Sequence, residues 1–269
     1  MDKILAVDLD GTVLDSKGQM TEGVRAALLN AQSAGFRLVL CTGRPLSGVR
    51  AIARALELSE GDWIVTNNGS CVQTLQHAVL AETRLSLADY QRVAHFCDSH
   101  DLSLIAVGGG RVYTHQSFVV PQVSRFCWLT DMPLVVTPFG ELEHPLSFYK
   151  CMICADSETI RIFKDQISCR FGDVYQCVQS EACYLEILPA GVSKGAALKR
   201  VAREYQISPA AIIGIGDNDN DRSMLAFAGT AIAMGNAVPE IKRLAHWVCP
   251  TNDEDGVAVA IDWIVKNRI

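Results

Sequence analysis

The strongest constraint on the fold is the alternation of short apolar segments with helical segments in the first third of the chain. Each apolar segment is continuous, as is typical of a strand buried on both faces of a sheet. Thr21 is placed to cap the first helix, and Gly35 follows where a helix end favours positive φ. This order predicts a parallel sheet with helices on both faces. The predicted strands are 3–9, 36–41 and 63–66, and the predicted helices are 21–34 and 46–56.

The last third of the chain repeats this alternation, whereas the middle combines short strands, glycine and proline turns and two helices. Ser193 and Ser86 are placed to cap helices, the latter in a capping box with Asp89. We therefore expect an α/β protein whose core, residues 1–82 and 187–269, carries an inserted α+β domain, residues 83–186. The further predicted helices are 87–100, 159–171, 194–205, 222–228, 239–245 and 255–266, and the further strands include 148–154, 174–178, 183–188, 211–215 and 230–234.

Charge and hydropathy exclude some classes of partner. The net charge of the 269 residues is -6, and such a surface does not attract nucleic acid. A small phosphorylated ligand stays open, because local cations and backbone amides can outweigh a weak field. No apolar run reaches the roughly 18 residues of a membrane span, and the first residues are too acidic for a signal peptide. We expect a cytoplasmic protein with no membrane partner.

The ten cysteines are scattered through mostly apolar stretches, which favours reduced, buried thiols. Cys151 and Cys154 form a C-x-x-C pair, but they lie in a predicted strand. An odd separation on a strand directs two side chains to opposite faces. This spacing argues against a zinc or redox site.

Two acids separated by one residue follow the first predicted strand, in the segment Asp8-Leu9-Asp10-Gly11-Thr12. In open parallel sheets, ligands bind beyond the carboxyl ends of the strands. Asp8 and Asp10 can there serve one centre as nucleophile and general acid. A surface loop with a capping aspartate is the plain alternative, and glycosyltransferases also use a D-x-D pair to hold a metal.

A second acidic segment, 216–221, follows another buried strand and reads Gly-Asp-Asn-Asp-Asn-Asp. Its acids match the first positions of a calcium-binding EF-hand loop. Arg222 stands where that loop needs glycine, however, and Ala228 where it needs a bidentate glutamate. We therefore reject a calcium loop.

The two acidic segments together predict a metal ion. If Asp8, Asp10, Asp217 and Asp221 meet at one sheet edge, two charges about 4 Å apart cost about 4 kcal/mol at an effective dielectric of 20. A cation must offset this repulsion. Carboxylate oxygens combined with a phosphate select Mg²⁺, which keeps several waters and takes few protein ligands.

Two other segments suit a phosphate group. Thr42-Gly43-Arg44 follows the second strand, where a hydroxyl group and exposed amides can hold phosphate oxygens; a simple strand-to-helix turn is the alternative. Lys194 begins a predicted helix. A cation is electrostatically disfavoured at that position, but beside free amides it suits an anion.

These four elements, in this order, resemble the haloacid dehalogenase (HAD) superfamily, and specifically its Cof-type phosphatases with a large α/β cap of class IIB. The resemblance covers essentially the whole chain. It implies a Rossmann-like core, with the cap inserted between the second and third motifs to read the substrate.

The resemblance also implies a role for each motif residue. Asp8 would be the nucleophile and Asp10 the general acid/base. The Mg²⁺ ligands would be the Asp8 carboxylate, the Asp10 backbone carbonyl and Asp217, supported by Asp221 from the second shell. The phosphate would be held by the Leu9 amide, Thr42, Gly43, Lys194 and Asn220.

The expected activity is hydrolysis of a small phosphate monoester through a phosphoaspartate, with sugar phosphates the expectation from the resemblance. A phosphosugar mutase of the same superfamily is the closest alternative, and a catalytically silent binding protein a more distant one. Candidate cap contacts are the Gly108–Arg111 loop and the 121–128 region, and Asn68 either faces the site or only forms a turn. Oligomeric state cannot be read from the sequence.

Overall fold

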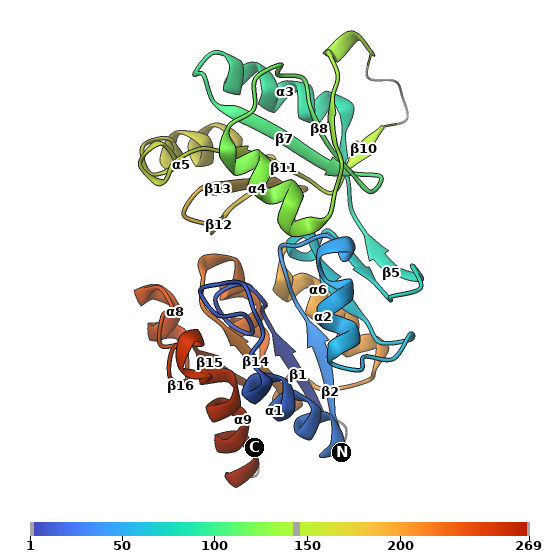
Figure 1. The fold of residues 1–269 in the computed structure, drawn as a ribbon, viewed down its shortest axis with the longest axis vertical. Coiled ribbons are helices and arrows are strands. Elements are labelled where there is room, and N and C mark those ends of the chain that lie inside the picture. Colours follow the sequence, from blue (N-terminus) through green and yellow to red (C-terminus); the bar gives the residue numbers. More distant parts are fainter. Residues whose placement is uncertain (1–2, 142–145, 268–269) are drawn as a thin grey trace. The chain divides into compact units, whose positions relative to one another are not determined.

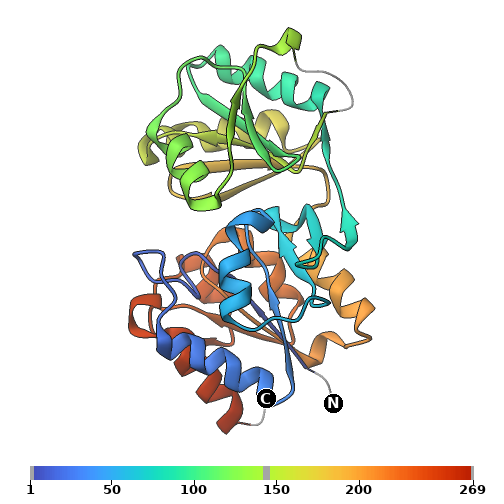
Figure 2. The same cartoon turned by 45° about the vertical axis from the view of Figure 1, so that its right-hand side comes forward.

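The computed structural model describes residues 3–141 and 146–267. The chain divides into two compact units, drawn from two directions in Figures 1 and 2. Unit 1 comprises Met1–Ala81 and Ser193–Ile269, and unit 2 comprises Glu82–Val192. The predicted core also includes residues 1–2 and 268–269, and the predicted insertion includes 142–145; these lie outside the described residues.

Unit 1 is built on a five-stranded sheet in the order β16-β15-β14-β1-β2. Every neighbouring pair is parallel, which confirms the predicted parallel sheet. Val7 at the end of β1 lies between Leu40 and Ile215, so these three strands end together. The strand bounds are β1 Lys3–Val7, β2 Phe36–Leu40, β14 Ile212–Gly216, β15 Thr230–Ala233 and β16 Trp247–Val248.

The helices of unit 1 cover both faces of this sheet. The chain leaves β1 toward β2 through α1, and leaves β14 toward β15, in the opposite direction, through α7. Because such crossovers are right-handed, α1 and α7 lie on opposite faces. Helix α9 packs beside α1, as Figure 1 shows, and α6 packs beside α7. The helix bounds are α1 Glu22–Ser33, α2 Arg50–Ala55, α6 Lys194–Glu204, α7 Arg222–Phe227, α8 Pro239–Leu244 and α9 Gly256–Lys266.

Three predicted helix caps are confirmed. The side chains of Thr21, Ser86 and Ser193 each accept a hydrogen bond from the backbone N–H three residues later. The Asp89 carboxylate in turn accepts a hydrogen bond from the Ser86 backbone N–H, which completes the capping box. These bonds satisfy N–H groups that a helix start otherwise leaves free.

In the described part of the chain, no helix is both long and apolar enough to cross a membrane.

Two predicted elements of the first third differ from the structure. The predicted helix 46–56 is a 3₁₀ turn, Leu46–Gly48, followed by the short helix α2. Strand β3, Ile64–Thr66, is not a strand of the main sheet; an isolated bridge between Cys41 and Val65 joins it to the residue after β2. It pairs instead with an antiparallel neighbour in a separate sheet, because the turn Asn67–Gly69 reverses the chain at once. That sheet also contains β4 Cys71–Gln73 and β5 Val79–Glu82.

Unit 2 contains a six-stranded sheet in the order β12-β13-β11-β7-β8-β9. Its pairings are antiparallel except that of β8 with β9. The helices are α3 Leu87–Asp98, α4 Pro121–Thr130 and α5 Ser157–Phe171. The strands are β7 Ser103–Gly108, β8 Arg111–Thr114, β9 Leu134–Val136, β11 Lys150–Cys154, β12 Gln176–Glu181 and β13 Tyr184–Leu188, and a two-stranded pair is formed by β6 Leu85–Ser86 and β10 Ser147–Phe148.

The two cysteines of the C-x-x-C pair lie on opposite faces of the unit 2 sheet, as predicted. Cys151 packs in the cluster that includes residues of α3 and α5, and Cys154 in the cluster that includes residues of α4. Both are buried, free thiols. Burial raises the pKa of both thiols well above the usual range. The pair is therefore a packing feature of strand β11.

A buried ion pair lies on the unit 2 sheet. Lys150 Nζ is 2.8 Å from Glu186 Oε1, and the two side chains are 1% and 2% exposed. Ser180 Oγ donates to the same carboxylate oxygen, and Lys150 Nζ lies 5.2 Å from the centre of the Phe126 ring. The attraction between such charges is largely offset by the cost of removing both from water. The pair therefore contributes little net stability, although losing one partner is costly.

We expect Lys150→Met to destabilise the protein by about 3–5 kcal/mol, because it leaves the Glu186 carboxylate buried without its lysine. The double variant Lys150→Met/Glu186→Leu should recover most of that loss. Urea unfolding followed by circular dichroism measures both. Lys266→Met, at an exposed pair with Asp262, is the control and should change stability by less than about 0.5 kcal/mol. A double variant as unstable as the single one would contradict this account.

Candidate active site

The predicted acids meet where the strand order of unit 1 reverses. The chain leaves β1 toward one edge of the sheet and β14 toward the other, so the loops after these neighbouring strands diverge. Such a switch point is where open α/β sheets bind ligands. Asp8 follows β1 and Asp217 follows β14, and the Asp8 N–H donates to Ile215 O at 3.1 Å. Asp8, Asp217 and Asp221 each offer a carboxylate oxygen within 4.8 Å of the others.

Lys194 is the cation of this cluster. Its Nζ lies 2.6 Å from Asp8 Oδ1 and 2.6 Å from Asp221 Oδ1. The side chain is fully buried, which is rare for lysine and requires paired charges. Lys194 is the first residue of α6, which packs against α7 directly after the second acidic segment. This packing brings the lysine to the carboxylates.

The pKa values of the site are shifted first by burial and then by the neighbouring charges. Burial, followed by the charge of Asp221, raises the pKa of Asp8 well above its usual range, although Lys194 opposes this. Burial and Asp221 likewise raise the pKa of Asp217 to about 7. Burial lowers the pKa of Lys194, but Asp221 and Asp8 outweigh it and raise that pKa overall. The cluster is short of positive charge, and its hard oxygen donors suit a divalent cation.

Asp221 also organises the loop that carries Asp217. Its Oδ2 accepts the backbone N–H groups of Asp217 and Asn218 at 2.9 and 3.1 Å, while Oδ1 binds Lys194. Both oxygens of a buried carboxylate are thus occupied. Asp221 therefore fixes the position of Asp217 as well as contributing charge.

Three residues support this centre: Gly11 and Thr12, which belong to the first motif but were assigned no role from the sequence, and Asn236, which was not expected. Thr12 Oγ1 donates to Asp217 Oδ1 at 2.8 Å. Gly11 has φ +79°, and a β-carbon there would lie 2.6 Å from Asp217 Oδ2. Asn236 Nδ2 donates to Gly11 O at 2.8 Å. The glycine is thus required by both conformation and space, and the sequence signal for it was its place between Asp10 and Thr12.

Thr42, Gly43 and Asn220 come together around Asn68. Asn220 Nδ2 donates to Asn68 Oδ1 at 3.1 Å, and the Asn68 N–H donates to Thr42 O at 2.9 Å. A β-carbon at Gly43 would lie 3.1 Å from Asn68 Nδ2, so glycine leaves room there. Among the described residues, Asn220 Oδ1 is buried without a hydrogen-bond partner. From the sequence, Asn68 could either form a turn or face the site. It does both, because it has φ 55° in the turn and its side chain binds Asn220.

The remaining predicted residues are Leu9 and Asp10. Leu9 lies between the two acids, and its C=O accepts the N–H groups of Thr12 and Leu14, which closes the loop. The Asp10 carboxylate does not join the group formed by Asp8, Asp217 and Asp221. It pairs with Arg44, whose Nη2 is 2.5 Å from Oδ1 and whose Nε is 2.9 Å from Oδ2. Sequence spacing could not predict this pair.

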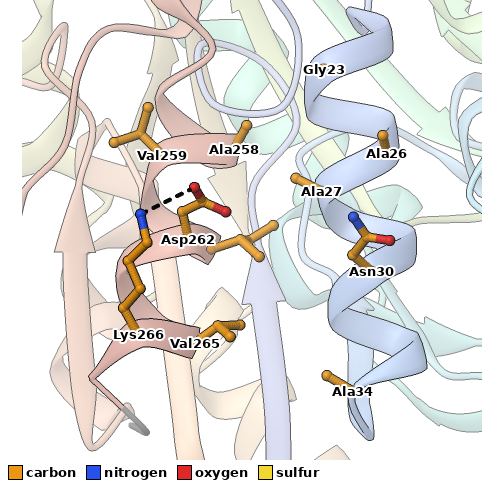
Figure 3. Close-up of a pocket in the computed structure, with 11 residues that line it drawn as sticks. Gly23, Ala26, Ala27, Asn30, Ala34, Ala258, Val259, Asp262, Val265 and Lys266 are labelled. Carbon is orange, nitrogen blue, oxygen red and sulfur yellow. Dashed lines mark ion pairs between the residues drawn. The ribbon is translucent and has the colours of Figure 1, made fainter.

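Unit 1 has a second concave surface, between α1 and α9, shown in Figure 3. It encloses about 530 Å³ and is lined largely by small side chains, among them Ala27 and Ala258. Its ion pair, Asp262 with Lys266 at 3.6 Å, joins consecutive turns of α9. The residues that line this groove include none of the predicted site residues.

Comparison with known proteins gives a consistent result. A protein-family model described as haloacid dehalogenase-like hydrolase matches residues 5–261. A Bacillus subtilis protein, YxeH, to which phosphatase activity is ascribed, is 33% identical over 98% of this chain and 99% of its own length. A solved haloacid dehalogenase-like hydrolase from Bacteroides thetaiotaomicron is 30% identical, covers 98% of this chain and 100% of its own, and superposes with a TM-score of 0.84.

The fold also matches a solved sugar phosphatase of HAD subclass IIB, with a TM-score of 0.83 at 21% identity. The match covers 98% of this chain and 99% of that one. It confirms the predicted fold, a parallel-sheet core with an inserted cap.

The raised pKa of Asp217 predicts how stability depends on pH in EDTA. A carboxyl group whose pKa rises on folding stabilises the protein only below its unfolded value near 4, and that contribution is lost as the pH rises to about 7. Asp217→Asn should therefore raise the melting temperature at pH 7–8. The expected rise is at least roughly 2–4 °C, which is the shift that corresponds to 1 kcal/mol of unfolding free energy. The difference should vanish near pH 4. Scanning calorimetry across pH 4–8, with Asp262→Asn as control, measures it; parallel curves for wild type and Asp217→Asn would contradict the prediction.

Proposed function

The chain belongs to the haloacid dehalogenase-like hydrolase family and is an enzyme of its phosphatase class, and from this premise we propose that it hydrolyses a small phosphate monoester through a phosphoaspartate on Asp8, with Mg²⁺ as cofactor. The observation that carries the proposal is the buried Lys194, held between Asp8 and Asp221 at 2.6 Å from each. Placing three carboxylates, two of them buried, beside one buried lysine is costly. A site that binds a metal ion and a phosphate group accounts for that cost.

Mg²⁺ fits the carboxylates of the site. Its ligands would be the Asp8 carboxylate, the Asp10 backbone carbonyl and Asp217, with Asp221 supporting them through the backbone of its loop. A bound divalent ion supplies positive charge that offsets the charge on the transferring phosphoryl group. Oxygen ligands held in place by their loop suit Mg²⁺ better than they suit softer metals.

The phosphate group would be held on the side of the site formed by the second motif. Its ligands would be the Leu9 amide, Thr42, Gly43, Lys194 and Asn220. The contacts that bring Asn220, Thr42 and Gly43 together around Asn68 support this assignment. A lysine that bridges Asp8 and the phosphate would hold both reactants in line for attack.

The reaction proceeds in two displacements. An oxygen of Asp8 attacks phosphorus, and the bond from phosphorus to the ester oxygen breaks as Asp10 gives that oxygen its proton. Asp10, now a carboxylate, then accepts a proton from the water that attacks the phosphoaspartate. This releases inorganic phosphate and restores both aspartates. Lys194 stabilises negative charge in both steps.

We assign substrate recognition to the inserted segment 83–186 and expect a sugar phosphate or a similar small metabolite. The fold is shared with a sugar phosphatase of subclass IIB, which supports this choice. The Gly108–Arg111 turn and residues 121–128 of α4 are the candidate contacts, and Trp128 in this region is 81% exposed. We also propose that the enzyme acts in the cytoplasm.

Phosphate release from a panel of phosphorylated metabolites tests the proposal. Wild type with Mg²⁺ should release phosphate, whereas EDTA or Asp8→Asn should reduce release to background, because the nucleophile or its cation is missing. Asp262→Asn, an exposed acid on α9, is the matched control and should retain activity. Acid-quenched samples of Asp10→Asn incubated with acetyl phosphate, which expels acetate without a proton, should accumulate a hydroxylamine-sensitive phosphoprotein, because the base for its hydrolysis is missing.

Two outcomes would contradict the proposal. Conversion of a hexose phosphate into an isomer without phosphate release would indicate a mutase. Equal, background-level release by wild type and Asp8→Asn across the panel would indicate a binding protein without turnover.

A further inference from the structure

We propose that Arg44 is a positioning residue for Asp10. The guanidinium group of Arg44 holds the Asp10 carboxylate in the one orientation that delivers a proton to the leaving oxygen. The inference rests on the proposed function and adds a residue to it. Asp10 is the more exposed partner, with a side-chain exposure of 36% against 12% for Arg44. Without a partner, a short, partly exposed carboxylate would rotate between several orientations.

The contact between the two side chains has two points. Arg44 Nη2 donates to Asp10 Oδ1 at 2.5 Å, and Arg44 Nε donates to Oδ2 at 2.9 Å. Paired, charge-assisted hydrogen bonds of this kind fix the plane of the carboxylate as well as its position. A lysine, as a point charge, would not. One lone pair on each oxygen is used by the guanidinium group, so the proton must be exchanged on the remaining side of the carboxylate.

Arg44 is itself anchored to the motif that is proposed to hold the phosphate. Its backbone N–H donates to Thr42 Oγ1 at 3.1 Å, and its C=O accepts the Asn67 N–H at 3.0 Å. The guanidinium Nη1 also donates to Gly48 O at 3.4 Å. The orientation of Asp10 is thus set relative to Thr42 by one residue that contacts both.

Direct binding of the phosphate by Arg44 is the rival role, and the leaving group of the substrate separates the two. An alkyl phosphate needs a proton on its leaving oxygen, whereas acetyl phosphate expels acetate without one. The value of kcat/KM covers only the steps up to formation of the phosphoaspartate. A positioning role therefore affects alkyl phosphates alone, whereas a phosphate ligand affects both substrates.

The experiment compares wild type with Arg44→Ala on a simple alkyl phosphate and on acetyl phosphate, with Mg²⁺. We expect kcat/KM to fall about 100-fold for the alkyl phosphate, the lower range of general-acid catalysis, and less than about 3-fold for acetyl phosphate. Competitive inhibition by inorganic phosphate should be unchanged. In an Asp10→Asn background, Arg44→Ala should have no further effect, because both changes remove the same contribution.

Two controls keep the result interpretable. Arg50→Ala removes another arginine of unit 1, one that binds the Leu75 carbonyl at 3.1 Å, and should leave both substrates unaffected. Arg44→Lys, which keeps the charge but not the two-point contact, should still lose at least about 10-fold on the alkyl phosphate. It also replaces Arg44→Ala if that variant does not fold.

Equal losses on both substrates, together with weaker inhibition by phosphate, would overturn the inference and identify Arg44 as a phosphate ligand. A full additional loss in the Asp10→Asn background would also overturn it. Absence of turnover of either substrate by wild type would instead overturn the proposed function, and the inference with it.

Discussion

The site depends on one electrostatic constraint: a buried lysine lies between the buried carboxylates of Asp8 and Asp221, and the partly buried carboxylate of Asp217 lies close to both acids. Each carboxylate raises the free energy of ionising its neighbours, and Lys194 offsets only part of this. A cluster of this kind does not stabilise the fold by itself. It persists because the sheet and the first turn of α6 hold it together. The rest of unit 1 thus holds these charges at the place where the proposed Mg²⁺ and phosphate would bind.

The topology of unit 1 explains how residues so far apart in sequence meet. β1 and β14 are neighbours, and their following loops diverge toward opposite edges. Lys194, the first residue of α6, contacts an acid from each of these loops, Asp8 and Asp221. Two local contacts complete the arrangement. Gly11 leaves room for the Asp217 side chain, and the Asp221 carboxylate fixes the loop by accepting the Asp217 backbone N–H. The acids converge because of strand order, and their distances are set by these local contacts.

This division explains what could be predicted from the sequence. The parallel sheet was predicted from the alternation of apolar and helical segments, and the helix caps from Thr21, Ser86 and Ser193, because these signals are local. The convergence of Asp8, Asp217 and Asp221 was predicted from the carboxyl-end rule, which also placed the Asp10 carboxylate among them, whereas the place of Lys194 was implied by the family resemblance. Pairs that depend on side-chain direction across the fold had no sequence signal. Arg44 with Asp10, and Lys150 with Glu186, are of this kind, and so is the bond from Asn236 to Gly11. The separate sheet of β3 was missed because the Asn67–Gly69 turn acts before the strand can pair further.

The proposed chemistry requires two aspartates, two residues apart, to behave differently, and their cationic partners differ accordingly. Asp8 is buried against a lysine, whose compact ammonium group can contact Asp8, Asp221 and a phosphate oxygen at once. That suits a nucleophile whose attacking oxygen must stay free to approach phosphorus. Asp10 is more exposed and is held by a planar guanidinium group that fixes its orientation. That suits a group that exchanges protons with the leaving oxygen and with water. In the proposed mechanism, one carboxylate is the nucleophile and the other the general acid/base. The type of cation beside each carboxylate, rather than the acids themselves, sets this difference.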